Sequence, residues 1–122
     1  MIVASGFQLN AITVKQQYNA WRSRDIISPL TLERLLAPHG PYGRVLRLSD
    51  GRIPSSVAFV QCAGSREESI GVRYCSRVCC MYSIKQAMLL SGTLPLADIT
   101  IYYMDTQVRC PPRIASDLFA TI

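Results

Sequence analysis

The stretch Val57-Ala-Phe-Val-Gln-Cys62 joins a short apolar run to a cysteine, and it decides the fold. A continuous apolar run of this length is typical of a strand that is buried on both faces. A loop containing glycine and charged residues follows, and residues 76–91 then predict a helix. Residues 97–104, rich in Ile and Tyr, predict a second strand. Strand, helix and strand in this order predict a βαβ unit, with parallel strands and a right-handed crossover.

The predicted helix has a regular apolar pattern and a clear end. Gly92 and Pro95 follow its last residues and should terminate it. Four apolar residues recur at three- and four-residue steps and should form its buried face: Val78, Met81, Ile84 and Met88.

The segments before this unit carry weaker signals. Ile2-Val-Ala4 predicts a short strand that needs neighbours from a larger sheet. Residues 28–36 predict a short helix with Thr31 as its N-cap. Residues 45–48 and 52–53, on either side of Ser49-Asp-Gly51, predict a hairpin. The tail, residues 106–122, is poorly patterned, with a hint of helix at 117–122.

Size and charge exclude several classes of protein. A chain of 122 residues predicts one domain, and no apolar run approaches the length of a membrane span. Residues 1–7 lack the basic region of a secretory signal, so we expect a soluble, cytoplasmic protein. The net charge is +5, but the arginines are scattered and no nucleic-acid motif accompanies them. We therefore expect no nucleic-acid partner.

The cysteines carry the strongest chemical signal. The chain has five, so they cannot all pair within it, and four follow the spacing Cys62-x12-Cys75-x3-Cys79-Cys80. Cys62 follows the first strand, and the other three lie at or just before the helix N-terminus. These two places face one crevice in an open α/β sheet, so four thiolates can converge. We predict one [4Fe–4S] cluster held by these four residues.

Charge supports the same prediction. A cluster with four thiolate ligands is anionic, and a helix N-terminus offers unpaired amide donors and positive potential. Arg66, Arg73 and Arg77 are near in sequence and could offset more of the charge, although solvated surface arginines are an equal alternative.

Other uses of the cysteines remain open. A zinc site would need the same thiolates, but structural zinc usually draws on two short CxxC-like pairs, which are absent here. Unligated buried cysteines are a second alternative. Catalysis by cysteine is less favoured, because the only histidine, His39, lies in a Pro/Gly loop. We do not expect Cys110 to be a ligand. The GxGxxG fingerprint is absent, and Asp105 alone is a weak sign of ribose binding.

Four segments of the sequence closely resemble the A subunit of heterodisulfide reductase: residues 59–66, 74–82, 84–87 and 101–105. In addition, Met1-Ile-Val-Ala-Ser-Gly-Phe7 resembles the short strand and glycine that close a flavin-binding half in thioredoxin-reductase-like proteins. The resemblance covers about residues 1–105 and does not continue into the tail. The FAD fingerprint and the ferredoxin-like cysteine runs of the family are also missing, so we expect a truncated or frame-altered fragment.

The resemblance implies a fold and an activity. The fold is α/β, part of a thioredoxin-reductase-like flavoprotein with two dinucleotide-binding domains. Residues 1–56 would close a flavin-binding-type domain and link it to the βαβ unit, residues 57–105, with 106–122 as an atypical tail. The activity would be reduction of the CoB–CoM or a related heterodisulfide, with flavin-based electron bifurcation, in methanogenesis.

The resemblance also implies cofactors and partners. It makes Cys62, Cys75, Cys79 and Cys80 the cluster ligands, and Ser5, Gly6 and Phe7 contacts of FAD. The partners would be other heterodisulfide reductase subunits and an electron-donating hydrogenase or dehydrogenase. The alternative function is a non-catalytic, zinc-stabilised or interaction module.

Overall fold

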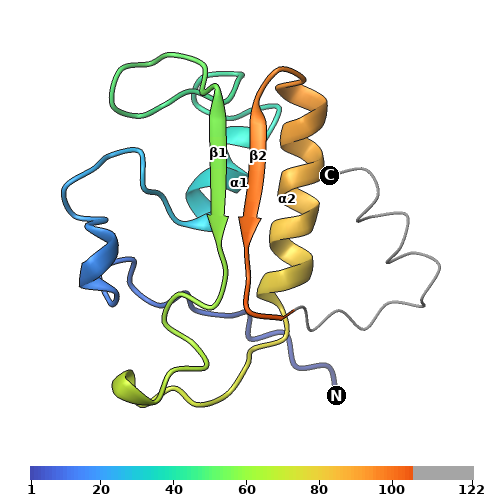
Figure 1. Cartoon of the computed structure of the whole chain (residues 1–122). Helices are drawn as coiled ribbons and strands as arrows, with labels where there is room; N and C mark the ends of the chain where they lie inside the picture. The colour runs from blue at the N-terminus through green and yellow to red at the C-terminus, as the bar shows by residue number, and fades with distance from the viewer. Residues whose placement is uncertain (106–122) are drawn as a thin grey trace.

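The computed structural model describes residues 1–105, which form two parallel strands packed on two α-helices (Figure 1). Two short 3-10 helices lie in the connections. The elements follow in the order 3-10 helix Gln16–Tyr18, α1 Pro29–Leu36, β1 Ser56–Val60, 3-10 helix Glu68–Ile70, α2 Cys79–Thr93 and β2 Asp98–Tyr102.

The central prediction of a strand, a helix and a parallel strand is confirmed. β1 pairs with β2 in parallel, in a register that runs from Ser56 opposite Asp98 to Val60 opposite Tyr102. The amide of Gln61 donates to the carbonyl of Tyr102 at 2.9 Å and extends the pairing by one residue. The two strands therefore end at the same edge of the sheet, and the loops that follow them begin side by side.

The core lies between one face of this sheet and both helices. Five buried residues form it: Leu32, Val45, Phe59, Ala87 and Leu90. Val57 of β1 and Ile99 and Ile101 of β2 pack against this cluster, so α1 and α2 cover the same face (Figure 1).

The prediction that the first strand is buried on both faces is wrong. Phe59 is the one buried residue of β1, and Val60 on the opposite face is 48% exposed. Tyr102, its partner on β2, is 61% exposed. Parallel sheets usually have both faces covered. Here the described residues supply helices for only one face.

The predicted buried face of α2 is also wrong except at one residue. Ile84 is buried, but Val78 and Met88 are each 52% exposed and Met81 is 39% exposed. The residues of α2 that are buried are Cys80, Ser83, Ile84, Gln86, Ala87 and Leu90. The helix has apolar residues on several sides, so periodicity alone could not identify the packed face. It also begins at Cys79, three residues later than predicted.

Helix α1 forms where the sequence predicts it, but its N-cap is Ser28 and not Thr31. Ser28 is extended, and its hydroxyl accepts the amide of Thr31 at 3.2 Å. Pro29 then occupies the first helical position, where a missing N–H costs nothing. A hydrogen bond joins α1 to α2: the side-chain amide of Gln86 donates to the Pro29 carbonyl at 2.8 Å.

Three predicted strand segments do not form, namely residues 2–4, 45–48 and 52–53. Residues 2–4 are exposed and make no strand, since no neighbouring strand in residues 1–105 pairs with them. The turn at Ser49-Asp-Gly51 is present, with the Arg47 amide donating to the Arg52 carbonyl at 2.8 Å. Its flanks make no strands, and Val45 packs into the core instead.

No helix among residues 1–105 is long and apolar enough to cross a membrane. The predicted helix at 117–122, the tail as a whole and Cys110 lie outside the described residues.

Candidate functional site

The loop after β1 turns sharply at the first predicted ligand. Cys62 has a left-handed backbone, with φ at 57°, and its carbonyl accepts the amide of Ser65 at 3.1 Å. Gly64 has φ at 86°, and its carbonyl accepts the side-chain amide of Asn10 at 2.6 Å. The N-terminal segment therefore holds this loop against the end of the sheet.

The segment before α2 carries the other three cysteines. The Cys75 sulfur accepts the amide of Arg77 at 3.3 Å, and Arg77 has φ at 61°. The hydroxyl of Ser76 donates to the Cys79 sulfur at 3.9 Å. Backbone and hydroxyl donors already point at two of the sulfurs, which is how proteins stabilise thiolate ligands.

Helix α2 begins within the cysteine motif itself. Cys79 and Cys80 are its first two residues, where backbone amides have no partner inside the helix. Cys80 is 3% exposed, whereas Cys62, Cys75 and Cys79 are half-buried. The adjacent cysteines thus differ in environment, because successive helical residues point in different directions.

Burial and two neighbouring thiols raise the pKa of Cys62. The pKa of Cys62 lies above its usual value, chiefly because of burial and then because of the nearby Cys79 thiol, with a smaller effect of Cys80. Arg66 acts in the opposite direction, through its charge and a hydrogen bond to Cys62. The end of β1 and the start of α2 therefore meet at these sulfurs.

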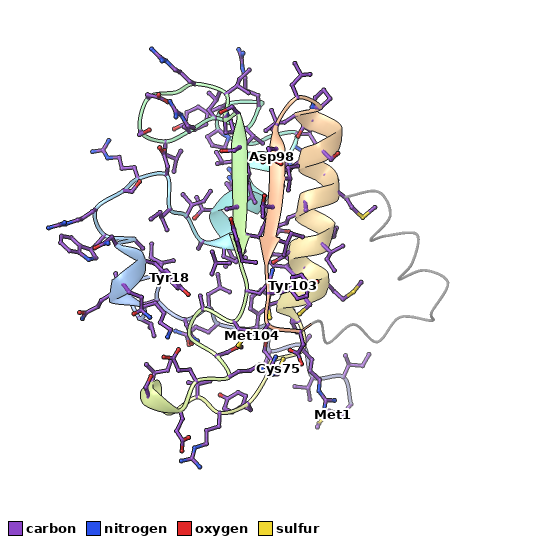
Figure 2. All side chains as sticks on the ribbon, in the orientation of Figure 1. Met1, Tyr18, Cys75, Asp98, Tyr103 and Met104 are labelled. Carbon is purple, nitrogen blue, oxygen red and sulfur yellow. The ribbon has the colours of Figure 1, made fainter. Side chains whose placement is uncertain are left out.

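The donor set suits an iron–sulfur cluster in its chemistry. Cys62 follows β1, Cys79 and Cys80 begin α2, and none of the four cysteines forms a disulfide. Figure 2 places Cys75 at this end and Asp98 at the other. Among residues 1–105, no three histidine, cysteine, aspartate or glutamate side chains are close enough together to bind one metal ion. The ligand set therefore stays a prediction.

The residues predicted to contact FAD lie at the same end of the molecule. The Phe7 ring packs edge-on against the ring of Tyr82 in the first turn of α2, with centroids 6.5 Å apart. Phe7 is still 60% exposed, and Gly6 has φ at 70° with open space around it. The structure thus places Phe7 against the cysteine-bearing helix, and the contact of Ser5, Gly6 and Phe7 with a flavin stays a prediction.

Tyr82 itself is held by α1. Its hydroxyl donates to the Glu33 carboxylate, and burial together with this contact raises the pKa of Tyr82 to about 12. The tyrosine therefore stays protonated over the whole physiological range and links the cysteine end of α2 to α1.

The three arginines near the cysteines have different environments. Arg66 donates to the carboxylate of Asp105, which lies beyond the end of β2. Arg73 pairs with Glu68 on the surface, and their side chains are 77% and 75% exposed. Arg77 is exposed. Arg73 and Arg77 are therefore solvated surface arginines, which is the alternative that the sequence left open, while Arg66 faces the cysteine site.

The pairing of Arg66 with Asp105 was missed by the sequence prediction, which considered Asp105 only as a ribose-binding residue. The signal was present, because both residues follow adjacent parallel strands. The carboxyl ends of such strands lie at one edge of the sheet. Opposite charges in the two loops could therefore have been paired.

Comparisons with known proteins bear on this site. No family model matches the chain. The A subunit of the H2:CoB-CoM heterodisulfide,ferredoxin reductase of Methanothermobacter marburgensis is 47% identical over 106 residues, which are 86% of this chain and 16% of that protein. The A subunit of the ferredoxin:CoB-CoM heterodisulfide reductase of Methanosarcina mazei is 44% identical over 98% of this chain and 15% of its own length.

A third relative carries a more specific name. The iron-sulfur A subunit of the CoB–CoM heterodisulfide reductase of Methanocaldococcus jannaschii is 41% identical over 86% of this chain and 16% of its own length. All three relatives are oxidoreductase subunits by name. Within that class, the chain is homologous to one segment of the A subunit of heterodisulfide reductase. It spans about 16% of the length of the relatives that it matches.

Proposed function

We propose that this chain is an electron-transferring segment of a heterodisulfide-reductase-type oxidoreductase, with Cys62, Cys75, Cys79 and Cys80 holding a [4Fe–4S] cluster. The observation that carries the proposal is that Cys62 lies just after β1 while Cys79 and Cys80 begin α2, with Cys75 at the same end of the sheet (Figure 2). The words "iron-sulfur" in the name of a relative that is 41% identical support it independently.

A cluster at this place would accept and release one electron at a time. The chain's own residues hold and orient it. The amide of Arg77 and the hydroxyl of Ser76 donate to the sulfurs of Cys75 and Cys79, which keeps these side chains directed toward the site. The first turn of α2 adds unpaired amides and positive potential. The buried Cys80 limits access of water on one side.

The activity of the whole oxidoreductase extends this proposal. We infer reduction of the CoB–CoM or a related heterodisulfide with flavin-based bifurcation, because the name of the Methanothermobacter relative contains both the heterodisulfide and ferredoxin. The same name begins with H2, which supports an electron-donating hydrogenase among the partners. Clustered free thiols fit a reducing compartment such as the cytoplasm.

The flavin part of the proposal concerns the N-terminal segment. The packing of Phe7 against Tyr82, in the first turn of the helix that Cys79 begins, supports Ser5, Gly6 and Phe7 as the residues that would contact FAD. The two-domain flavoprotein fold and the division into residues 1–56, 57–105 and 106–122 belong to the same proposal.

A pair of cysteine variants tests the ligand set. After anaerobic reconstitution with iron and sulfide, Cys79→Ser should lose the brown chromophore and its EPR signal, because one ligand is missing. Cys110→Ser is the matched control and should keep both. Retention of the full signal in Cys79→Ser, or its loss in Cys110→Ser, would show that the ligand set is wrong.

A further inference from the structure

We propose that Arg66, anchored by Asp105, is a positioning residue that fixes the two cysteine-bearing loops together and raises the reduction potential of the group they hold. The proposal deepens the proposed function and rests on it for the potential, whereas the anchoring of the loops can be tested without any cluster.

Arg66 joins two parts of the β1–α2 connection to the residue that lies beyond the end of β2. Its own position is in the loop after β1, four residues beyond Cys62. Its amide donates to the carbonyl of Tyr74, the residue before Cys75, at 3.3 Å. Its guanidinium donates to Asp105, beyond the end of β2. The loop that carries Cys62 and the loop that carries Cys75 are therefore connected through one residue.

The backbone of Arg66 has an energetically unfavourable conformation, so its surroundings must keep it in place. Its φ of 56° lies in the left-handed region, which residues with a side chain rarely adopt. Such a conformation persists only where the surroundings fix it. The neighbouring residues also form a short antiparallel bridge, in which the Glu67 amide donates to the Val72 carbonyl at 2.6 Å. Lys15 pairs with Glu67 and holds this loop from the other side.

The place of the guanidinium gives it an electrostatic effect on the cysteines. The Arg66 side chain is 28% exposed and donates to Asp105, and its charge lowers the pKa of the Cys62 thiol. Reduction of a cluster adds one negative charge, which a nearby fixed cation stabilises. Screening by solvent weakens this interaction only in part, because the guanidinium is largely covered.

The other candidate arginine provides a matched control. Arg73 lies in the same connection and pairs with Glu68, so it has the same type of side-chain partner as Arg66. Its side chain is 77% exposed, and the described contacts do not connect it to a cysteine. Arg73→Gln therefore removes the same charge from the same loop without touching the site.

The first experiment uses the full chain without metal and measures amide hydrogen exchange. Arg66→Gln and Asp105→Asn should each speed exchange at the Arg66 amide and in residues 74–79 by about tenfold or more, because the common anchor is lost. Arg73→Gln should leave these rates unchanged. Wild-type rates at these amides in both anchor variants would overturn the positioning role.

The second experiment measures the midpoint potential of the reconstituted chain by EPR-monitored redox titration. Arg66→Gln should shift it to a more negative value, Arg66→Lys should largely restore it, and Arg73→Gln should leave it unchanged. A tenfold change in the ratio of reduced to oxidised centres corresponds to about 59 mV for one electron.

The outcomes separate this inference from the proposed function. A wild-type chain that takes up no iron and sulfide overturns the proposed function, and with it the effect on the potential. A wild-type cluster whose potential is the same in Arg66→Gln overturns the electrostatic part of the inference alone.

Discussion

At the scale of single residues, left-handed backbone is concentrated in the loops that carry the cysteines. Cys62, Arg66 and Arg77 have φ values of 57°, 56° and 61°. Each such residue costs roughly 1–2 kcal/mol relative to an ordinary backbone conformation. Strain of this kind is often found at functional sites, where the surroundings fix an unusual geometry. Here it turns the chain sharply after β1 and before α2, which brings the cysteines to one end of the sheet.

Gly64 provides a prediction at this scale. An alanine there would carry φ at 86°, and its Cβ would lie 3.1 Å from the Asn10 side-chain nitrogen. Gly64→Ala should therefore lose roughly 1–2 kcal/mol from the backbone and about 1 kcal/mol more from the hydrogen bond to Asn10. The measurement is the free energy of unfolding in denaturant.

Gly71→Ala is the matched control for that variant. Gly71 has a similar φ of 76°, but nothing lies within 4 Å of the position of its Cβ. Gly71→Ala should therefore lose only the roughly 1–2 kcal/mol that the backbone conformation costs. Equal losses for the two variants would mean that Asn10 does not hold the Gly64 loop.

The sequence predicts positions along the chain better than contacts across it. The placement of Cys62 after a strand and of Cys79 and Cys80 at a helix start depends on local signals, and it is confirmed. The ion pair of Arg66 with Asp105 depends on how two loops turn after their strands. The order of the strands indicates that the two loops share one edge of the sheet, but no periodicity or spacing specifies how they turn, so the contact itself required the structure.

At the scale of elements, the order and type of the helices and strands follow from pattern, but their buried faces do not. Helix α2 was predicted from a stripe through Met81 and Met88, both of which are exposed. The packed stripe runs through Cys80, Ile84 and Ala87. The helix has apolar groups on both sides, so only the position of the sheet decides which side is buried.

The N-cap of α1 provides a prediction at the scale of elements. Ser28→Ala removes the hydroxyl that accepts the Thr31 amide at 3.2 Å and should reduce the free energy of unfolding by about 1 kcal/mol. Thr31→Ala leaves that acceptor in place and should cost clearly less. The measurement is the free energy of unfolding of both variants in denaturant. A larger loss of this free energy for Thr31→Ala than for Ser28→Ala would contradict the assignment of Ser28 as the cap.

At the scale of the whole molecule, the described residues form a sheet with one covered and one open face. The open face presents Val60 and Tyr102 to solvent, although parallel sheets usually have helices on both sides. The relatives are several times longer, since this chain spans about 16% of their length. The prediction that β1 is buried on both faces relied on the general rule that parallel sheets have both faces covered. In residues 1–105 only one face of the sheet is covered.

The proposed electron transfer requires that the four cysteines assemble an iron–sulfur cluster and not a zinc site. The most direct test is the iron, acid-labile sulfide and zinc content of the anaerobically purified and reconstituted chain. We predict about four iron and four sulfide per chain, as a [4Fe–4S] cluster requires. Stoichiometric zinc without acid-labile sulfide would contradict the claim.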